Sequence, residues 1–119
     1  VVALAGMVPR ALAVAEALDG EDISLEVIDP RTIVPLDTKT ILASVAKTGR
    51  LVIADETRLS CGVASEISAI VAEQGFQHLR APIIRSARPD APVSAAPDHE
   101  AAVKPTPGKI VGAVYKVLN

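Results

Sequence analysis

The sequence predicts an α/β domain of three layers, in which a mainly parallel sheet lies between two layers of helices. Short apolar runs alternate with segments of helical periodicity, which is typical of a parallel sheet with right-handed crossovers. One run, residues 51–54 (Leu-Val-Ile-Ala), has no polar alternation, as expected for a strand covered on both faces. The expected strands are residues 1–5, 25–29, 51–54 and 82–84.

These strands are expected in the order 2-1-3-4. The chain moves one way from the first strand to the second and the other way from the first to the third, which leaves a switch point between the first and third strands. Open parallel sheets bind ligands beyond the carboxyl ends of their strands at such a point. Gly6, Met7, Asp55 and Glu56 follow these two strands, and we expect them to line a crevice there.

Capping residues predict the limits of the first two helices. Pro9 suits the first turn of the first helix, and Gly20 ends it. Asp37 can accept hydrogen bonds from the exposed amides of a second helix over residues 38–47, which Gly49 ends.

The second half of the chain predicts two more helices and a long connection. The third helix carries one apolar face, ends at Gly75 and is marked by Val63, Ile67, Ile70, Val71 and Gln74. Thr106 and Pro107 begin a last helix through Leu118. Residues 85–105 hold four prolines and are expected to form an extended, irregular connection that lies on a neighbour.

Composition narrows the class of protein. The 119 residues suffice for one domain, and half of them are hydrophobic with one Phe, one Tyr and no Trp, so the core must be aliphatic. A net charge of −2 gives no case for nucleic-acid binding. A single cysteine fits a reducing compartment, and no apolar run is long enough to span a membrane. We expect a soluble protein of the cytoplasm or an organelle matrix.

The start of the chain also carries an expectation. Val1 already lies inside a strand-like run, and the only methionine is Met7. We therefore predict that residues 1–119 form a single domain cut from a longer protein.

Most candidate sites have an ordinary structural explanation. No glycine-rich phosphate loop occurs, so Gly6 is interpreted as a turn residue. His78 and His99 are too far apart for the spacing of a metal site. Cys61 lies just before a helix, but no histidine pattern accompanies it, which favours a structural position over a nucleophile.

A group of carboxylates is the strongest candidate for chemistry. Asp55 and Glu56 follow the third strand, and Glu66 lies one helix away, near enough to reach the same crevice. Acid–base catalysis would need one of these groups in a pocket. The favoured interpretation is structural: Asp55 and Glu56 pair with Arg58 or Arg31, or cap the following turn.

The third helix has a second face of small residues, namely Ser65, Ser68, Ala69 and Ala72. Small side chains permit the close approach of another helix. This face either packs within the domain or forms a subunit interface, and the sequence leaves both open.

A series of motifs occurs in a specific order. They are Gly6, Met7 and Val8, residues 29–37 (Asp-Pro-Arg-Thr-Ile-Val-Pro-Leu-Asp), residues 47–52, Asp55 and Glu56, residues 61–67, residues 81–85 and residues 89–93. In this order they resemble the C-terminal domain of the transketolase superfamily. The chain is most similar to the β subunit of the E1 component of 2-oxo acid dehydrogenase complexes of the pyruvate, branched-chain and acetoin types.

The chain departs from this family at three places. Aromatic residues that the family often carries are missing at residues 57–59 and 94–96, and the antiparallel edge strand that usually precedes the first strand is absent. These departures leave undecided which substrate branch of the family the chain belongs to and which surface contacts its partners.

The resemblance implies a transketolase C-terminal domain-like fold and a place in a thiamine-diphosphate enzyme. The intact enzyme would use thiamine diphosphate and Mg²⁺ to decarboxylate a 2-oxo acid oxidatively and pass the acyl group to E2. This chain alone is expected to bind no cofactor or metal, because the family's Gly-Asp-Gly and Asn-Asn motif is missing and its activating glutamate lies in another domain. No catalytic residue is assigned.

The resemblance also implies partners. They are the E1 α subunit or other domains of the parent chain, a second E1 β copy and the E2 acyltransferase, and the isolated domain is expected to be a homo-oligomer. The implied role is subunit contact without catalysis. The alternatives are the equivalent domain of transketolase, a deoxyxylulose-phosphate synthase or an oxoacid:ferredoxin oxidoreductase, and a stand-alone α/β ligand-binding module.

Overall fold

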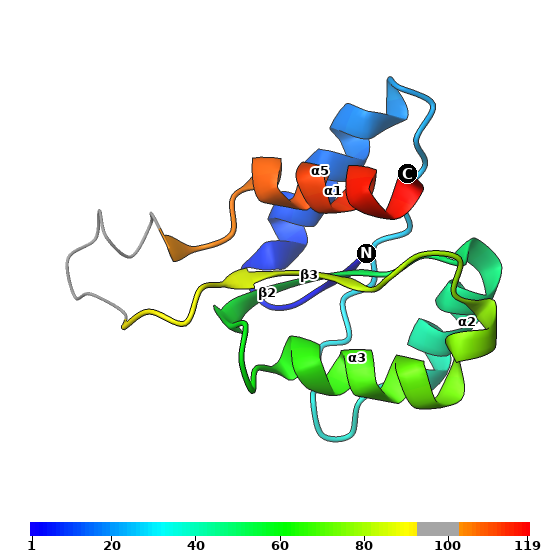
Figure 1. The fold of residues 1–119 in the computed structure, drawn as a ribbon. Coiled ribbons are helices and arrows are strands. Elements are labelled where there is room, and N and C mark those ends of the chain that lie inside the picture. Colours follow the sequence, from blue (N-terminus) through cyan, green and yellow to red (C-terminus); the bar gives the residue numbers. More distant parts are fainter. Residues whose placement is uncertain (93–102) are drawn as a thin grey trace.

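The computed structural model describes residues 1–92 and 103–119. Two helices cover one face of the sheet and two cover the other, so the predicted three layers are confirmed (Figure 1). The first pair is α1 (Met7–Asp19) and α5 (Pro107–Leu118), and the second pair is α2 (Thr38–Thr48) and α3 (Val63–Gln74).

The sheet has three parallel strands in the order β1-β2-β3. They are β1 (Val2–Ala3), β2 (Val52–Arg58) and β3 (Ile84–Arg88). Val2 lies opposite Ile53, which lies opposite Arg85. The run without polar alternation is therefore the central strand, as predicted.

The prediction of a second strand over residues 25–29 is wrong. Only Ile28 is paired, through a single parallel bridge to Val2. The Ile28 amide donates to the Val1 carbonyl at 2.9 Å, and the Ala3 amide donates to the Ile28 carbonyl at 2.9 Å. The segment thus lies on the predicted side of β1. Pro30 has no N–H and β1 is only two residues long, so the ladder cannot extend.

The expected boundary between the last strand and the following connection is also wrong. The strand begins at Ile84 and continues to Arg88, where an irregular connection was expected. Its polar residues hid it, because an edge strand needs no continuous apolar run. A short 3₁₀ helix, η1 (Phe76–His78), precedes it. Much of the expected connection, residues 93–102, lies outside the described residues.

The predicted caps are confirmed. The Asp37 carboxylate accepts from the Thr40 amide at 3.0 Å at the start of α2, and Gly49 ends this helix with a φ of 71°. At the start of α5, the Thr106 hydroxyl accepts from the Lys109 amide at 3.3 Å.

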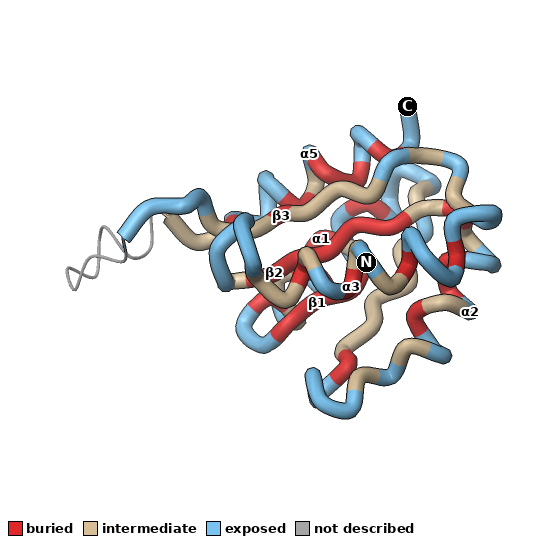
Figure 2. The backbone as a smooth tube through the Cα atoms, turned by 60° about the horizontal axis from the view of Figure 1, so that its bottom comes forward, coloured by how far each residue is buried: buried red, intermediate tan, exposed pale blue. Residues whose placement is uncertain are grey.

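The core consists of two aliphatic clusters, one on each face of the sheet. The backbone of β1 and much of β2 is buried, whereas β3 is mostly half-buried (Figure 2). Phe76 is 71% exposed and Tyr115 is 36% exposed, so the aromatic residues stay outside the core, as the composition predicts.

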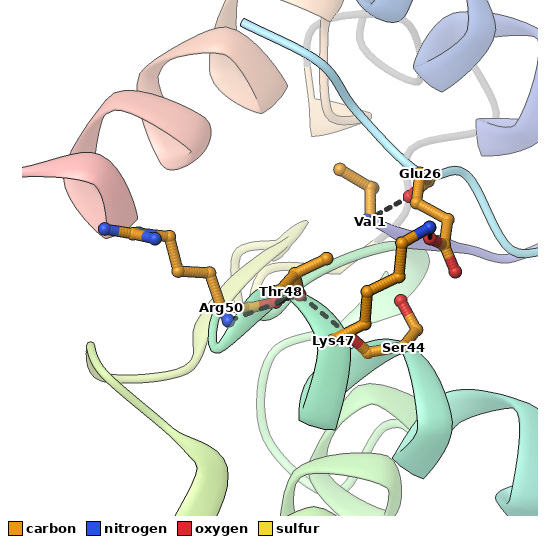
Figure 3. Close-up of polar contacts among 6 residues, drawn as sticks. All are labelled: Val1, Glu26, Ser44, Lys47, Thr48 and Arg50. Carbon is orange, nitrogen blue, oxygen red and sulfur yellow. Dashed lines mark hydrogen bonds and ion pairs between the residues drawn. The ribbon is translucent and has the colours of Figure 1, made fainter.

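Polar contacts join the segment beside β1 to the end of α2 (Figure 3). The Lys47 ammonium lies 2.7 Å from the Glu26 carboxylate, and this hydrogen bond lowers the pKa of Glu26. The Thr48 hydroxyl donates to the Ser44 carbonyl at 2.9 Å. Arg50 in turn donates from Nε to the Val117 carbonyl at 2.7 Å, which ties this corner to the end of α5.

Candidate functional site

A pocket lies at the predicted switch point between β1 and β2. Its volume is about 470 Å³, and its walls include Ala5, Pro30, Asp55 and Glu56. The two acidic residues therefore reach the crevice that the strand order predicts, although β2 continues past them to Arg58.

Gly6 and Met7, the other two residues expected at this crevice, lie in two different places. A Cβ atom at Gly6 would lie 2.7 Å from Glu56 Oε1, so glycine allows the Glu56 side chain to approach this turn. Met7 is fully buried, in the core cluster between α1 and the sheet, and does not line the pocket. The reason is that α1 already begins at Met7, which turns its side chain into the core.

The Asp55 carboxylate joins the last part of β2 to the start of α3. It accepts from the Thr57 amide at 2.8 Å, from the Thr57 hydroxyl at 2.6 Å and from the Ala64 amide at 3.2 Å. Asp55 is only 2% exposed. One carboxylate therefore fixes both the irregular last part of β2 and the first turn of α3.

Of the other predicted site residues, Arg31 lines the pocket at the switch point and Arg58 shares a second pocket with Glu56, whereas Glu66 lines neither. Glu56 is half-buried, and within the described ranges it makes no hydrogen bond or ion pair. Arg31 pairs with Asp29 at 2.8 Å rather than with the strand carboxylates. Arg58 is exposed and lines a second pocket of about 560 Å³, which Glu56 also lines. Glu66 lies exposed in the first turn of α3, outside both pockets.

The loop after β2 is held by long-range hydrogen bonds that the sequence does not predict. The Asp90 carboxylate accepts from the Ser60 amide at 3.1 Å and from the Ser60 hydroxyl, and the hydroxyl contact lowers the pKa of Asp90. Arg85 donates to the Leu59 carbonyl and the Ser65 hydroxyl, each at 2.7 Å. These pairs span 20 to 30 residues, so local motifs carry no signal for them.

Metal binding has no support among the side chains that the structure describes. No group of three or more His, Cys, Asp or Glu residues is arranged there to hold a metal ion. In the described part of the chain, no helix is long and apolar enough to cross a membrane.

Comparisons with known proteins agree on one family. The family described as "Transketolase, C-terminal domain" matches residues 1–110. The chain is 42% identical over 117 residues to the β subunit of acetoin:2,6-dichlorophenolindophenol oxidoreductase of Bacillus subtilis, covering 98% of this chain and 34% of that protein. It is 49% identical over 92 residues to the pyruvate dehydrogenase E1 component subunit β of Leifsonia xyli, covering 77% and 27%.

A third relative and a solved structure agree. The 2-oxoisovalerate dehydrogenase subunit β of Pseudomonas aeruginosa is 45% identical over 103 residues, or 87% of this chain and 29% of that protein. A solved structure described as an inactive β4 tetramer of a split-gene transketolase has a TM-score of 0.82 at 27% identity, covering 98% of this chain and 37% of that one. The chain thus spans about a third of the length of these curated relatives.

Proposed function

The chain belongs to the transketolase C-terminal domain family, among the 2-oxo acid dehydrogenase E1 β-like proteins, and from this premise we propose that it is a non-catalytic assembly domain of an E1 β subunit. The parent enzyme would decarboxylate a 2-oxo acid with thiamine diphosphate and Mg²⁺ bound to other domains. The contacts proposed for this domain are with the rest of the E1 assembly and with the E2 acyltransferase.

The buried, hydrogen-bonded carboxylate of Asp55 is the observation that best supports a non-catalytic role. It is the one carboxylate buried among the described residues, and its oxygens accept hydrogen bonds from the chain's own turn and helix. A general acid or base must exchange a proton with a substrate, and a carboxylate engaged in this way is positioned for structure instead. The acidic residue beside it, Glu56, lacks any hydrogen-bond partner that would orient it in the described structure.

A first prediction concerns the cofactor. Titration of thiamine diphosphate and Mg²⁺ into the isolated chain, followed by calorimetry, should give no binding in the micromolar range, because the described residues offer no ligand set for the ion. A complete thiamine-diphosphate enzyme in the same buffer is the positive control. Micromolar binding by the isolated chain would contradict the proposal that other domains bind the cofactor.

A second prediction concerns association. The segment around Ile28 forms only one bridge to β1, and Ala69 and Ala72 are exposed on α3, so both surfaces are open to a partner. We expect the isolated chain to form a dimer or higher oligomer at tens of micromolar. The related split-gene transketolase subunit is described as a tetramer.

Sedimentation velocity measures this association. An Ala69→Glu variant should reduce the oligomer if the small-residue face of α3 forms the contact, whereas Lys39→Glu on α2 is a control of similar exposure. A clean monomer at high micromolar concentration would contradict the prediction.

A ligand-binding module remains the second candidate. The pocket beside Glu56 has the position at which open parallel sheets bind small molecules. The coding sequence around this chain separates the candidates. A thiamine-type domain upstream without a Gly-Asp-Gly motif supports the E1 β proposal, and its absence supports the module.

A further inference from the structure

The outer edge of β3 borders an open groove. The order β1-β2-β3 leaves β3 as the last strand of the described sheet. A groove of about 440 Å³ runs between this edge and one side of α5, lined by Arg85, Ser86, Lys109, Gly112 and Lys116 together with apolar neighbours. It is separate from the pockets beside Glu56 and Arg58.

The strand offers unpaired backbone groups to this groove. The Ile84 amide donates to the Leu51 carbonyl at 3.1 Å, so Ile84 directs its backbone groups toward β2. Because backbone direction alternates along a strand, Arg85 directs its N–H and C=O away from the sheet. An exposed strand edge of this kind can pair with an added strand.

Ser86 carries a polar group without a partner in the described part of the domain. The residue is only 7% exposed and lines the groove, yet its hydroxyl has no hydrogen-bond partner among the described residues. Buried hydroxyl groups are normally paired, so an unpaired one indicates a missing partner.

Gly112 keeps the floor of the groove open. It lies in the middle of α5, where glycine is a poor helix former, and a Cβ atom there would meet nothing within 4 Å. No contact inside the domain therefore requires glycine at this position. Its absence of a side chain leaves room for a group from outside.

The charge of the groove selects the kind of partner. Lys109 and Lys116 are exposed on the same side of α5, and within the described ranges neither ammonium has a hydrogen bond or ion pair. No Asp or Glu is found among the described residues that line the groove. A second copy of this edge would bring lysines of both copies together, which is unfavourable. The complementary partner is acidic.

We propose that this groove binds an extended, acidic peptide segment, which adds to β3 as an outer strand. Its backbone pairs with the outward groups of Arg85, and its carboxylates pair with Lys109 and Lys116. The open space beside Gly112 leaves room for a side chain of the peptide. The proposal does not depend on the identity of the parent enzyme.

Fluorescence anisotropy tests the proposal with a labelled peptide of about eight alternating Glu and Val residues. We expect it to bind the chain at least about tenfold more tightly than the matching Lys and Val peptide. The same acidic peptide with N-methylated central residues should bind weakly, because it cannot pair with a strand. Equal binding of the acidic and basic peptides, or no binding, would overturn the proposal.

Variants of the chain locate the bound peptide. The double variant Lys109→Glu and Lys116→Glu should weaken binding about tenfold, while Lys39→Glu on α2 should leave it unchanged. Gly112→Leu fills the groove and should also abolish binding, with Ala46→Leu at an exposed position of α2 as the matched control. The lysine variants change only exposed side chains, so they decide the matter even if Gly112→Leu fails to fold. Complete displacement by millimolar inorganic phosphate would indicate a small-anion site and overturn the peptide proposal.

Discussion

Replacing Ile53 with alanine should lower the free energy of unfolding by about 2–5 kcal/mol. Ile53 is fully buried in the central strand, opposite Val2 on one side and Arg85 on the other. Its side chain belongs to the cluster that α2 and α3 close, so truncation removes contacts with both. Denaturant titration measures the loss.

The control for this prediction is the same substitution at a surface position. Ile33 is 43% exposed, and Ile33→Ala should change stability by less than about 0.5 kcal/mol. A loss of stability below about 1 kcal/mol for Ile53→Ala would contradict the prediction. It would mean that the cluster beneath α3 depends less on the central strand than the packing indicates.

Replacing Asp55 with alanine should cost about 2–4 kcal/mol of stability. The substitution removes the acceptor of three hydrogen bonds, and the Ala64 amide is left unpaired in a buried position. Asp55→Asn should cost less, because one amide oxygen can still accept. Thermal and denaturant unfolding both report the difference.

The neighbouring acidic residue provides the matched comparison. Glu56→Gln should change stability by less than about 0.5 kcal/mol, because Glu56 has no partner among the described residues. Equal losses at Asp55 and Glu56 would contradict a specific structural role for Asp55. If Asp55→Ala leaves stability unchanged, its carboxylate would be free for another purpose.

The parts of the fold that could be predicted depend on local signals. Asp37, Gly49, Gly75 and Thr106 each mark a helix limit through hydrogen bonding or backbone freedom within a few residues. The central strand was evident because residues 51–54 must be apolar on both faces. Pairing between distant segments has no such signal, so the loss of the strand around Ile28 and the extension of β3 were not foreseen.

The candidate sites, too, could be predicted only in part. Strand order places Asp55 and Glu56 at the crevice, and the spacing of Asp55 and Thr57 carries the signature of the observed turn. Met7 lies in the core rather than at the crevice because α1 begins directly after Gly6. The groove at β3 was missed because Arg85 and Ser86 were assigned to an irregular connection.

The layer formed by α1 and α5 joins the two ends of the described chain. Arg10 in α1 donates to the Pro105 carbonyl just before α5, and the Tyr115 hydroxyl of α5 donates to the Glu21 carboxylate just after α1. During synthesis, α1 leaves the ribosome long before its partner helix exists. Until residues 107–118 emerge, α1 alone can cover this face of the sheet, so the nascent domain exposes the apolar surface that α5 later covers.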